Sequence, residues 1–293
     1  MNQVHVMFRF PSLVIVQLVI AALGGDRAHA SDSVPQEITV ELPGDAFMEF
    51  VWIEPGSFTM GSPEEEPGRL AAEGPQRQVT ISQGFYLGKY EITQSQWQSV
   101  MGTGGTEKWR GRYVQIHPEQ PAVYISWEDV QTFIKTLNFL HGTKEPGGPL
   151  YRLPSEAEWE YTARAGTTAR WSFGDDETEL GDHAWYEANT WSTGTKYAQP
   201  IGARLPNPWG LHDMHGNVWE WVQDWHSAEY YGITAGIASG SVVDPRGPSA
   251  GDTRVLRGGG FSDVAKGLRS ACRFRHLPSA RGYSMGARLV RTR

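Results

Sequence analysis

Three stretches of the chain begin with one polar signature and continue with apolar residues at helical spacing. In each, a hydroxyl residue is followed three positions later by an acid or amide: Thr93 with Gln96, Ser126 with Asp129, and Ser155 with Glu158. Such a pair satisfies free backbone N–H groups in the first turn of a helix. The pattern predicts helices over residues 93–101, 126–140 and 156–165, with Gly166 ending the third.

Strand-type residues are concentrated in the first third of the chain. Residues 48–53 and 57–61 flank Pro55-Gly56 and predict a hairpin, and residues 78–81 and 85–90 resume strand character. Residues 62–74 are acidic and contain proline, which predicts a surface loop. From Thr167 onward only residues 255–256 and 288–290 predict clear strands. We therefore expect an α+β fold with low regular secondary structure and many ordered loops, and such loops are often functional.

The first 46 residues differ from the rest. Arg9 precedes an apolar run from Leu13 to Leu23, and Ala28-His29-Ala30 supplies small residues at a cleavage site. We predict a signal peptide over residues 1–30, a loose leader over 31–46 and one domain over 47–293. An uncleaved anchor is the alternative, but the run is shorter than the roughly 20 residues that span a bilayer. The product is expected to be secreted or periplasmic in a bacterium, and not bound to a membrane after cleavage.

Composition narrows the function classes. The net charge of −7 becomes −8 once Arg9, Asp26 and Arg27 are removed, and no Lys/Arg-rich stretch predicts a nucleic-acid partner. Cys272 is the only cysteine, so an intramolecular disulfide is impossible. Twelve tryptophans and 34 glycines indicate loops fixed by large aromatic side chains. We expect a monomer.

Residues 210–221, GLHDMHGNVWEW, carry the clearest candidate chemistry. Asp213 and Glu220 flank a tight Gly216-Asn217 turn, so side-chain and carbonyl oxygens could converge on a hard cation such as calcium. Three nearby indoles are expected to wall this site from water: Trp219, Trp221 and Trp225. Two imidazoles in the same stretch could mark a transition-metal site, but hydrogen-bonded loop residues are the favoured interpretation of His212 and His215.

The chain resembles a known family through several motifs in order. They read WIEPGSFTMGS, YEITQSQW, PAVYISWEDV, YRLPSEAEWEYTARAG, NPWGLHDMHGNVWEWVQDW, and RVLRGGGF followed by RSACRFR and MGARLVR. From Phe50 to Arg291 the sequence is similar to the formylglycine-generating enzymes, also called sulfatase-modifying factors. The resemblance implies the complex, C-type lectin-like fold of that family and bound calcium.

The resemblance also implies metal ligands. The principal calcium site would use the side chain of Asp213, the carbonyls of Gly216 and Val218, and the side chain of Glu220. A second site would use Asn189 and the carbonyl of Thr190, although no acidic partner is evident in residues 192–199.

One departure from the family concerns its redox metal. Members that make formylglycine bind copper through two cysteines in the loop after a GGS turn, because Cu(I) prefers thiolates. The corresponding residues 258–269 contain no cysteine, and Gly260 replaces the serine. Cys272 follows the loop and is expected to be a small buried thiol. Copper-dependent formylglycine generation is therefore not expected.

Two other branches of the family differ in their layout. The sulfoxide synthases take iron on histidines of an added helical domain, for which we expect no room. A periplasmic branch, implicated in oxidising a siderophore precursor, resembles this chain in layout.

Several arginines are close together in sequence near the end of the chain: Arg257, Arg269, Arg273, Arg275 and Arg288. Buried pairs with carboxylates are favoured over a groove for anionic substrates.

Two functions remain open. The first is an exported oxidoreductase that acts on a peptide or protein substrate in a groove near Trp219, Gly260 and Arg273, with no catalytic residue assigned. The alternative is a non-catalytic, calcium-stabilised binding or scaffold module, since loops on a rigid frame are readily retuned.

Overall fold

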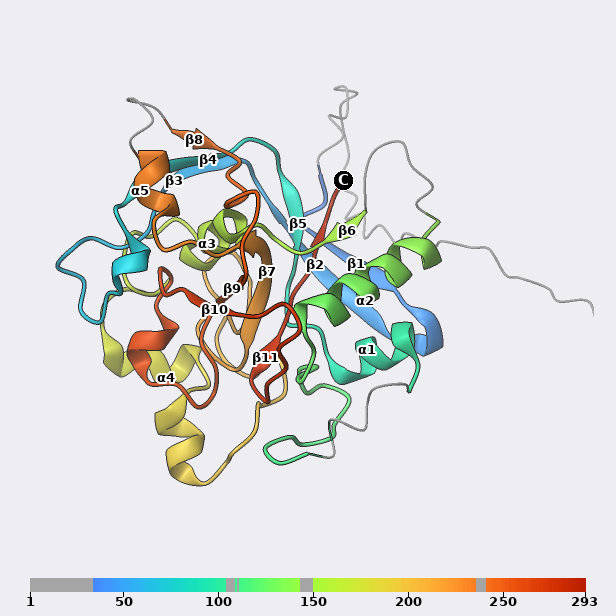
Figure 1. Cartoon of the computed structure of the whole chain (residues 1–293). Helices are drawn as coiled ribbons and strands as arrows, with labels where there is room; N and C mark the ends of the chain where they lie inside the picture. Colours follow the sequence, from blue (N-terminus) through green and yellow to red (C-terminus); the bar gives the residue numbers. More distant parts are fainter. Residues whose placement is uncertain (1–33, 104–108, 110, 143–149, 236–240) are drawn as a thin grey trace, which may run out of the picture. The chain divides into compact units, whose positions relative to one another are not determined.

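The computed structural model describes residues 34–103, 109, 111–142, 150–235 and 241–293 (Figure 1). The predicted signal peptide over residues 1–30 lies outside them. All the helices and strands given below belong to one unit, Pro35–Arg293. No helix in the described residues combines the length and apolar character needed to cross a membrane.

The three predicted helices are confirmed, with their caps. They are α1 Gln94–Met101, α2 Trp127–Leu140 and α3 Glu156–Arg164, and each begins with the reciprocal capping box that its sequence predicts. Ala165 ends α3 with a left-handed φ of 45°. Two short helices were not predicted, α4 Leu180–His183 and α5 Tyr230–Ala235.

A five-stranded sheet corrects the predicted start of the domain. Its order is β1 Glu37–Glu41, β2 Phe47–Ile53, β5 Phe85–Gly88, β12 Val290–Arg291 and β6 Tyr151–Arg152. β1 pairs antiparallel with β2, with Glu37 opposite Val51. Residues 37–41 are therefore not a loose leader, because their alternating Ile38 and Val40 fit a half-buried strand that pairs one side of β2.

The predicted hairpin around Pro55-Gly56 does not form. β3 Gly56–Met60 instead belongs to a three-stranded sheet with β4 Arg77–Ile81 and β8 Val242–Val243. Both sides of β2 already pair with β1 and β5, so β3 takes its hydrogen bonds from β4. Both segments were correctly predicted to be strands, but the predicted pairing of β2 with β3 was wrong.

A four-stranded sheet contains β7 Trp219–Trp225, a strand that the sequence patterns did not predict. Its order is β10 Phe274–His276, β9 Arg254–Arg257, β7 and β11 Met285–Gly286. β7 begins inside the 210–221 motif, at Trp219, and pairs with β9 on one side and β11 on the other. The motif therefore ends in an internal strand of a sheet.

Helix α3 lies at the centre of the main core. It contacts β3, β4, β7 and β9, and Figure 1 shows it among these strands, whereas α1 packs against α2 and α2 contacts β6. Trp159 of α3 packs in one apolar cluster with Val51, Phe85 and Val222. All nine residues of α3 are buried, including Glu156, Glu158, Glu160 and Arg164. Buried charges require partners, and α3 therefore organises the polar interior as well as the apolar one.

Candidate functional site

The loop before β7 is built from residues in left-handed conformations. The φ angles are 58° at Asp213, 143° at Gly216 and 65° at Asn217. A Cβ atom at Gly216 would collide with the carbonyl of Trp185, so glycine is required there. Because of this tight turn, the Asp213 side chain and the start of β7 lie in the same buried region.

Three carboxylates occupy this region. Asp213 accepts a hydrogen bond from Gly202 N–H through Oδ2 at 2.7 Å, while its buried Oδ1 has no partner. Glu220 is held by both arms of Arg288 at 2.7 Å and by Trp159 Nε1 at 2.7 Å. Glu91, which the sequence analysis missed, accepts from Val218 N–H at 3.0 Å and from the Asn217 amide at 2.7 Å.

The region carries more negative charge than its one arginine compensates. Burial raises the pKa of Asp213 to about 6. Burial, together with the charges of Asp213 and Glu220, also raises the pKa of Glu91 well above its ordinary value. The unpartnered Asp213 oxygen and this surplus charge fit a bound calcium ion, which prefers oxygen ligands.

The geometry also limits the metal hypothesis. Within the described residues, no three His, Cys, Asp or Glu side chains are grouped to hold a metal ion. An ion here would need the predicted carbonyls of Gly216 and Val218 as well as carboxylate oxygens. Asn217 is not a ligand, because its amide oxygen accepts from Gln199 N–H at 2.8 Å.

The indoles around the loop differ from the predicted wall. Trp159 of α3, not one of the three predicted residues, contacts Glu220. Trp221 donates to the carbonyl of Ile125 at 3.0 Å, and Trp225 lies under the guanidinium of Arg254 at 3.4 Å from its ring centroid. These two indoles therefore contact the surrounding backbone and Arg254, and not the carboxylates of the candidate metal centre.

The second predicted calcium site has no free oxygen among its named ligands. Asn189 Oδ1 accepts from Tyr186 N–H at 2.9 Å, and its amide donates to the carbonyl of Ala184. The Thr190 carbonyl accepts from the backbone of Thr193 and Thr195. Both groups therefore stabilise the local turn, and we do not propose a second ion.

The two histidines are hydrogen-bonded loop residues, as predicted. His212 Nδ1 lies 2.8 Å from the carbonyl of Arg204. His215 Nδ1 lies 3.0 Å from the carbonyl of Leu268, and its Nε2 accepts from Ser172 N–H at 3.0 Å. Burial lowers the pKa of His215 to about 4, so it is neutral at pH 7.

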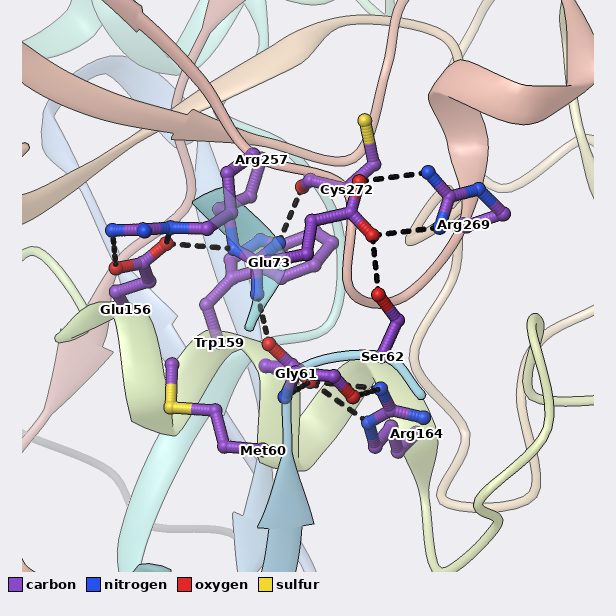
Figure 2. A network of polar contacts seen from close by, with 12 residues as sticks. Met60, Gly61, Ser62, Glu73, Glu156, Trp159, Arg164, Arg257, Arg269 and Cys272 are labelled. Carbon is purple, nitrogen blue, oxygen red and sulfur yellow. Dashed lines mark hydrogen bonds and ion pairs between the residues drawn. The ribbon is translucent and has the colours of Figure 1, made fainter. Parts of the chain in front are cut away.

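Four of the five clustered arginines form buried carboxylate pairs, which confirms the favoured interpretation. Figure 2 shows part of this network, in which Arg257 pairs with Glu160 and Arg269 with Glu73. Arg288 pairs with Glu220 near the loop before β7, and Arg275 alone of the five is exposed.

Arg273 does not line a groove, which corrects the sequence prediction. It is buried and donates to both oxygens of Glu156, at 2.6 and 2.8 Å, and to the carbonyls of Ala72 and Ser227. Glu156 is correspondingly a partner of arginine rather than a cap of α3. Four of the five guanidinium N–H donors are therefore used inside the protein.

The acidic loop over residues 62–74 is tied to the same network. Glu66 and Glu73 are buried and both accept from Arg269, so the loop is not simply a surface loop. Although burial opposes it, the contact with Arg269 lowers the pKa of Glu73. Cys272 is a buried free thiol, as predicted, and burial raises its pKa to about 12.

Trp219 and Gly260 lie together at the edge of this frame. A Cβ atom at Gly260 would lie 3.3 Å from Trp219 Cδ1 and 3.1 Å from Ser284 Cβ. Asp263, which the sequence analysis did not single out, accepts from Trp219 Nε1 at 2.8 Å and from Gly260 N–H at 2.9 Å. We call Trp219, Gly260, Asp263 and Ser284 the Trp219–Gly260 site.

The Trp219–Gly260 site is distinct from a cavity of about 350 Å³ at the start of α3. That cavity is lined by residues including Arg152, Ser155 and Arg246, and by none of the predicted groove residues. Burial raises the pKa of the Asp263 carboxyl, although the hydrogen bonds from Gly260 and Trp219 act in the opposite direction. The site thus consists of a partly buried acid beside the buried indole of Trp219.

Comparison with known proteins assigns the family. The pattern of the sulfatase-modifying factor enzyme 1-like domain matches residues 37–293. This chain belongs to the sulfatase-modifying factor family. The formylglycine-generating enzyme of Thermomonospora curvata is 29% identical over an alignment of 288 residues, covering 78% of this chain and 84% of that enzyme.

Two further relatives agree with this assignment. The formylglycine-generating enzyme of Streptomyces coelicolor is 34% identical over 182 residues, 58% of this chain, and the match spans about half of that enzyme, 52%. The structure of PvdO from Pseudomonas aeruginosa is 32% identical, with a TM-score of 0.70, and covers 84% of this chain and 94% of PvdO. The α+β fold with many loops is therefore the fold of this family.

The loop after Gly258-Gly259-Gly260 is packed closely against its neighbours. Asp263 and Leu268 lie in this loop, and it contains no thiol. The backbone of Gly259 has a φ of 81°, and a Cβ atom there would lie 2.9 Å from Leu268 Cδ1. The loop is packed closely around apolar and carboxylate side chains instead of soft metal ligands.

Proposed function

We propose that this sulfatase-modifying factor homologue is an exported, calcium-stabilised protein that binds a peptide-like ligand at the Trp219–Gly260 site. The observation that carries the proposal is the Asp263 carboxyl, which holds Trp219 Nε1 and Gly260 N–H in one arrangement. Two hydrogen bonds to one partly buried acid make a rigid site, and rigid sites lose less entropy when a ligand binds.

Formylglycine generation by the copper route is not part of the proposal. The loop over residues 258–269 has no cysteine. Cys272 cannot substitute, because a buried thiol with its pKa raised to about 12 is protonated at pH 7, and Cu(I) takes thiolates. One thiol would also supply only half of a ligand pair.

Calcium would be held by Asp213 Oδ1 and Glu220 with the carbonyls of Gly216 and Val218. When bound, it would neutralise the surplus negative charge shared by Glu91, Asp213 and Glu220. The Glu220–Arg288 pair would stay in place and link the ion to the start of β7. Its role in this proposal is to stabilise the frame beneath the ligand.

An oxidoreductase acting on the same bound ligand is the second candidate. The similarity to formylglycine-generating enzymes and to PvdO over most of the chain favours it. This candidate requires a redox metal and an electron acceptor such as O2. Metal analysis of the purified protein and an oxygen electrode therefore separate it from pure binding.

A matched pair of glycine variants tests the ligand site. A methyl group at Gly260 would press on Trp219 and Asp263, whereas a methyl group at Gly181 would meet nothing within 4 Å. We expect Gly260→Ala to weaken binding of a mixed peptide library about tenfold, and Gly181→Ala to leave it unchanged. The measurement is calorimetric titration of the folded full chain.

Equal affinities for the two variants would refute the location of the site. Calcium alone, with no oxygen uptake during peptide binding, supports the binding function. Stoichiometric copper or iron with peptide-dependent oxygen uptake would instead establish the oxidoreductase.

A further inference from the structure

Four aromatic side chains from separate segments meet next to Gly260. Tyr113 lies 4.9 Å from Trp191 and 5.3 Å from Tyr283, measured between ring centroids. Phe261, directly after Gly260, lies 5.7 Å from Tyr283 and 6.3 Å from Trp191. We call Tyr113, Trp191, Phe261 and Tyr283 the aromatic platform.

Backbone contacts hold the platform in shape. Tyr124 N–H donates to the carbonyl of Gly282 at 2.8 Å, and its hydroxyl donates to the carbonyl of Arg112 at 3.3 Å. The Thr190 hydroxyl donates to the carbonyl of Phe261. Each platform segment is therefore fixed close to its ring, so little ordering is needed on binding.

The platform is only partly covered. Phe261 is fully buried and forms its floor, whereas Tyr113, Trp191 and Tyr283 are half-buried. Half-buried aromatic rings in contact offer a flat apolar surface on which another ring can stack. Tyr283 and Phe261 adjoin Ser284 and Gly260 in the chain, so the platform lies next to the Trp219–Gly260 site.

Two exposed cations border the platform. The Arg112 guanidinium lies 4.7 Å from the ring centroid of Tyr113, and Lys196 Nζ lies 5.1 Å from that of Trp191. Neither forms an ion pair with a carboxylate in the described part of the chain. Two acids lie on this side, and both accept hydrogen bonds: Glu187 from the Ser192 hydroxyl, and Asp263 from Trp219 and Gly260.

These features together indicate the chemistry of the ligand. A cationic ligand would meet two like charges, whereas a carboxylate would meet two cations without ion-pair partners. We propose that the aromatic platform binds a peptide segment in which an aromatic side chain is followed by an acidic one, the ring stacking on Trp191 and Tyr283. This inference rests on the proposed function, and it specifies the ligand of the same site.

Four capped tetrapeptides test it by calorimetric titration at low salt. They carry Tyr-Glu, Tyr-Gln, Tyr-Lys or Leu-Glu between glycines. The wild-type chain is expected to bind the Tyr-Glu peptide about tenfold more tightly than Tyr-Lys or Leu-Glu, since one stacked pair or one charge contact contributes on that order. The Tyr-Gln peptide should fall between them.

Variants connect the preference to the named side chains. Trp191→Ala should weaken Tyr-Glu binding about tenfold, Trp191→Phe should retain most of it, and Lys196→Glu should favour Tyr-Lys over Tyr-Glu. Phe139→Ala removes an aromatic ring that is 82% exposed on α2 and should change nothing. Unchanged thermal melting of each variant shows that it is folded.

Several outcomes would overturn the inference. Equal affinity for Tyr-Glu and Tyr-Lys, or full binding by Trp191→Ala, would refute the platform while peptide binding at the Trp219–Gly260 site stood. Binding of an acidic oligosaccharide in place of every peptide would refute the ligand class. No peptide binding at millimolar concentration, with Gly260→Ala behaving as wild type, would refute both this inference and the proposed function.

Discussion

At the scale of single residues, Asp224 is the most unusual ionisable group in the core. It is buried on β7, and its Oδ2 accepts from Glu156 N–H at 2.9 Å. Burial, followed by the charge of Glu156, raises its pKa to about 8. In an unfolded chain the pKa of aspartate is about 3.9, so the folded state holds this proton more tightly. The corresponding stability is fully present below pH 4 and is lost as pH rises through 8.

Asp224→Asn should remove this pH dependence. Near pH 4 the variant and wild type should unfold at similar urea concentrations, because both carry a neutral group. The variant should then become relatively more stable by about 1.4 kcal/mol per pH unit up to about pH 8. Urea titrations across this range measure the difference. Asp252→Asn, at an exposed position, should give a constant offset. A parallel pH profile for Asp224→Asn and wild type would contradict the prediction.

At the scale of elements, buried ion pairs join α3 to its neighbours. Glu160 of α3 accepts from Arg257 of β9, from Arg164 one turn later and from Gly61 N–H after β3 (Figure 2). Three elements that are distant in sequence therefore meet at one carboxylate. Breaking such a buried pair leaves an arginine without compensation, which costs far more than losing an exposed pair.

Glu160→Gln should destabilise the chain by about 3–5 kcal/mol, because the longer contact with Glu156 would be the remaining carboxylate contact of Arg257 among the described residues. Chemical denaturation measures the free energy of unfolding. The matched control is Glu37→Gln, which removes the exposed partner of Lys89 and should cost no more than about 1 kcal/mol. Similar effects of both changes would mean that the network contributes little.

Helix α2 offers a test of the capping signal. Ser126 Oγ accepts from Asp129 N–H at 3.1 Å, so Ser126→Ala should cost about 1 kcal/mol. Thr136→Ala, inside the same helix, removes a hydroxyl that bonds only the preceding turn and should change stability by less than about 0.5 kcal/mol. Denaturation midpoints compare the two. Equal losses of stability in the two variants would show that the Ser126 cap contributes no more than an ordinary hydroxyl within the helix.

At the scale of the whole molecule, calcium is expected to link the loop before β7 to the rest of the fold. The proposed ion would contact the buried Asp213 Oδ1, which has no hydrogen-bond partner, and would offset the negative charges that, with burial, raise the pKa of Glu91. A ligand that binds only the folded chain stabilises it by about 2.7 kcal/mol when the free ligand concentration is about 100 times its Kd. The effect should appear as a shift in the melting temperature.

Removal of calcium with a chelator should lower the melting temperature by several degrees, and added calcium should restore it. Asp213→Asn should melt at the same temperature with and without calcium. Asp175→Asn, at an exposed position, should behave like wild type. Calcium-independent melting of the wild-type chain would exclude the ion from this proposal.

Local sequence signals determined the helices and much of the candidate chemistry. Ser126 and Asp129, or Ser155 and Glu158, interact within one turn, so their spacing alone fixes where each helix begins. The order of motifs identified the family, and the missing cysteines in residues 258–269 are a fact of sequence. Buried arginine pairs were also expected, because arginine clusters rarely remain unpaired in a core.

Only the tertiary structure decided the partners. Glu91 lies more than 100 residues from Val218, and Asp263 lies 44 residues from Trp219, so no spacing rule could join them. β7 was not predicted because Glu220 and Asp224 are residue types usually found at the surface. In the folded chain they are buried, because Arg288 donates to Glu220 and Glu156 N–H donates to Asp224. β3 likewise could not reveal its partner, since strand type is local but pairing depends on which edges remain free. Burial and pairing are collective properties of the folded chain, and this is the physical reason that the sequence could not name Glu91 and Asp263.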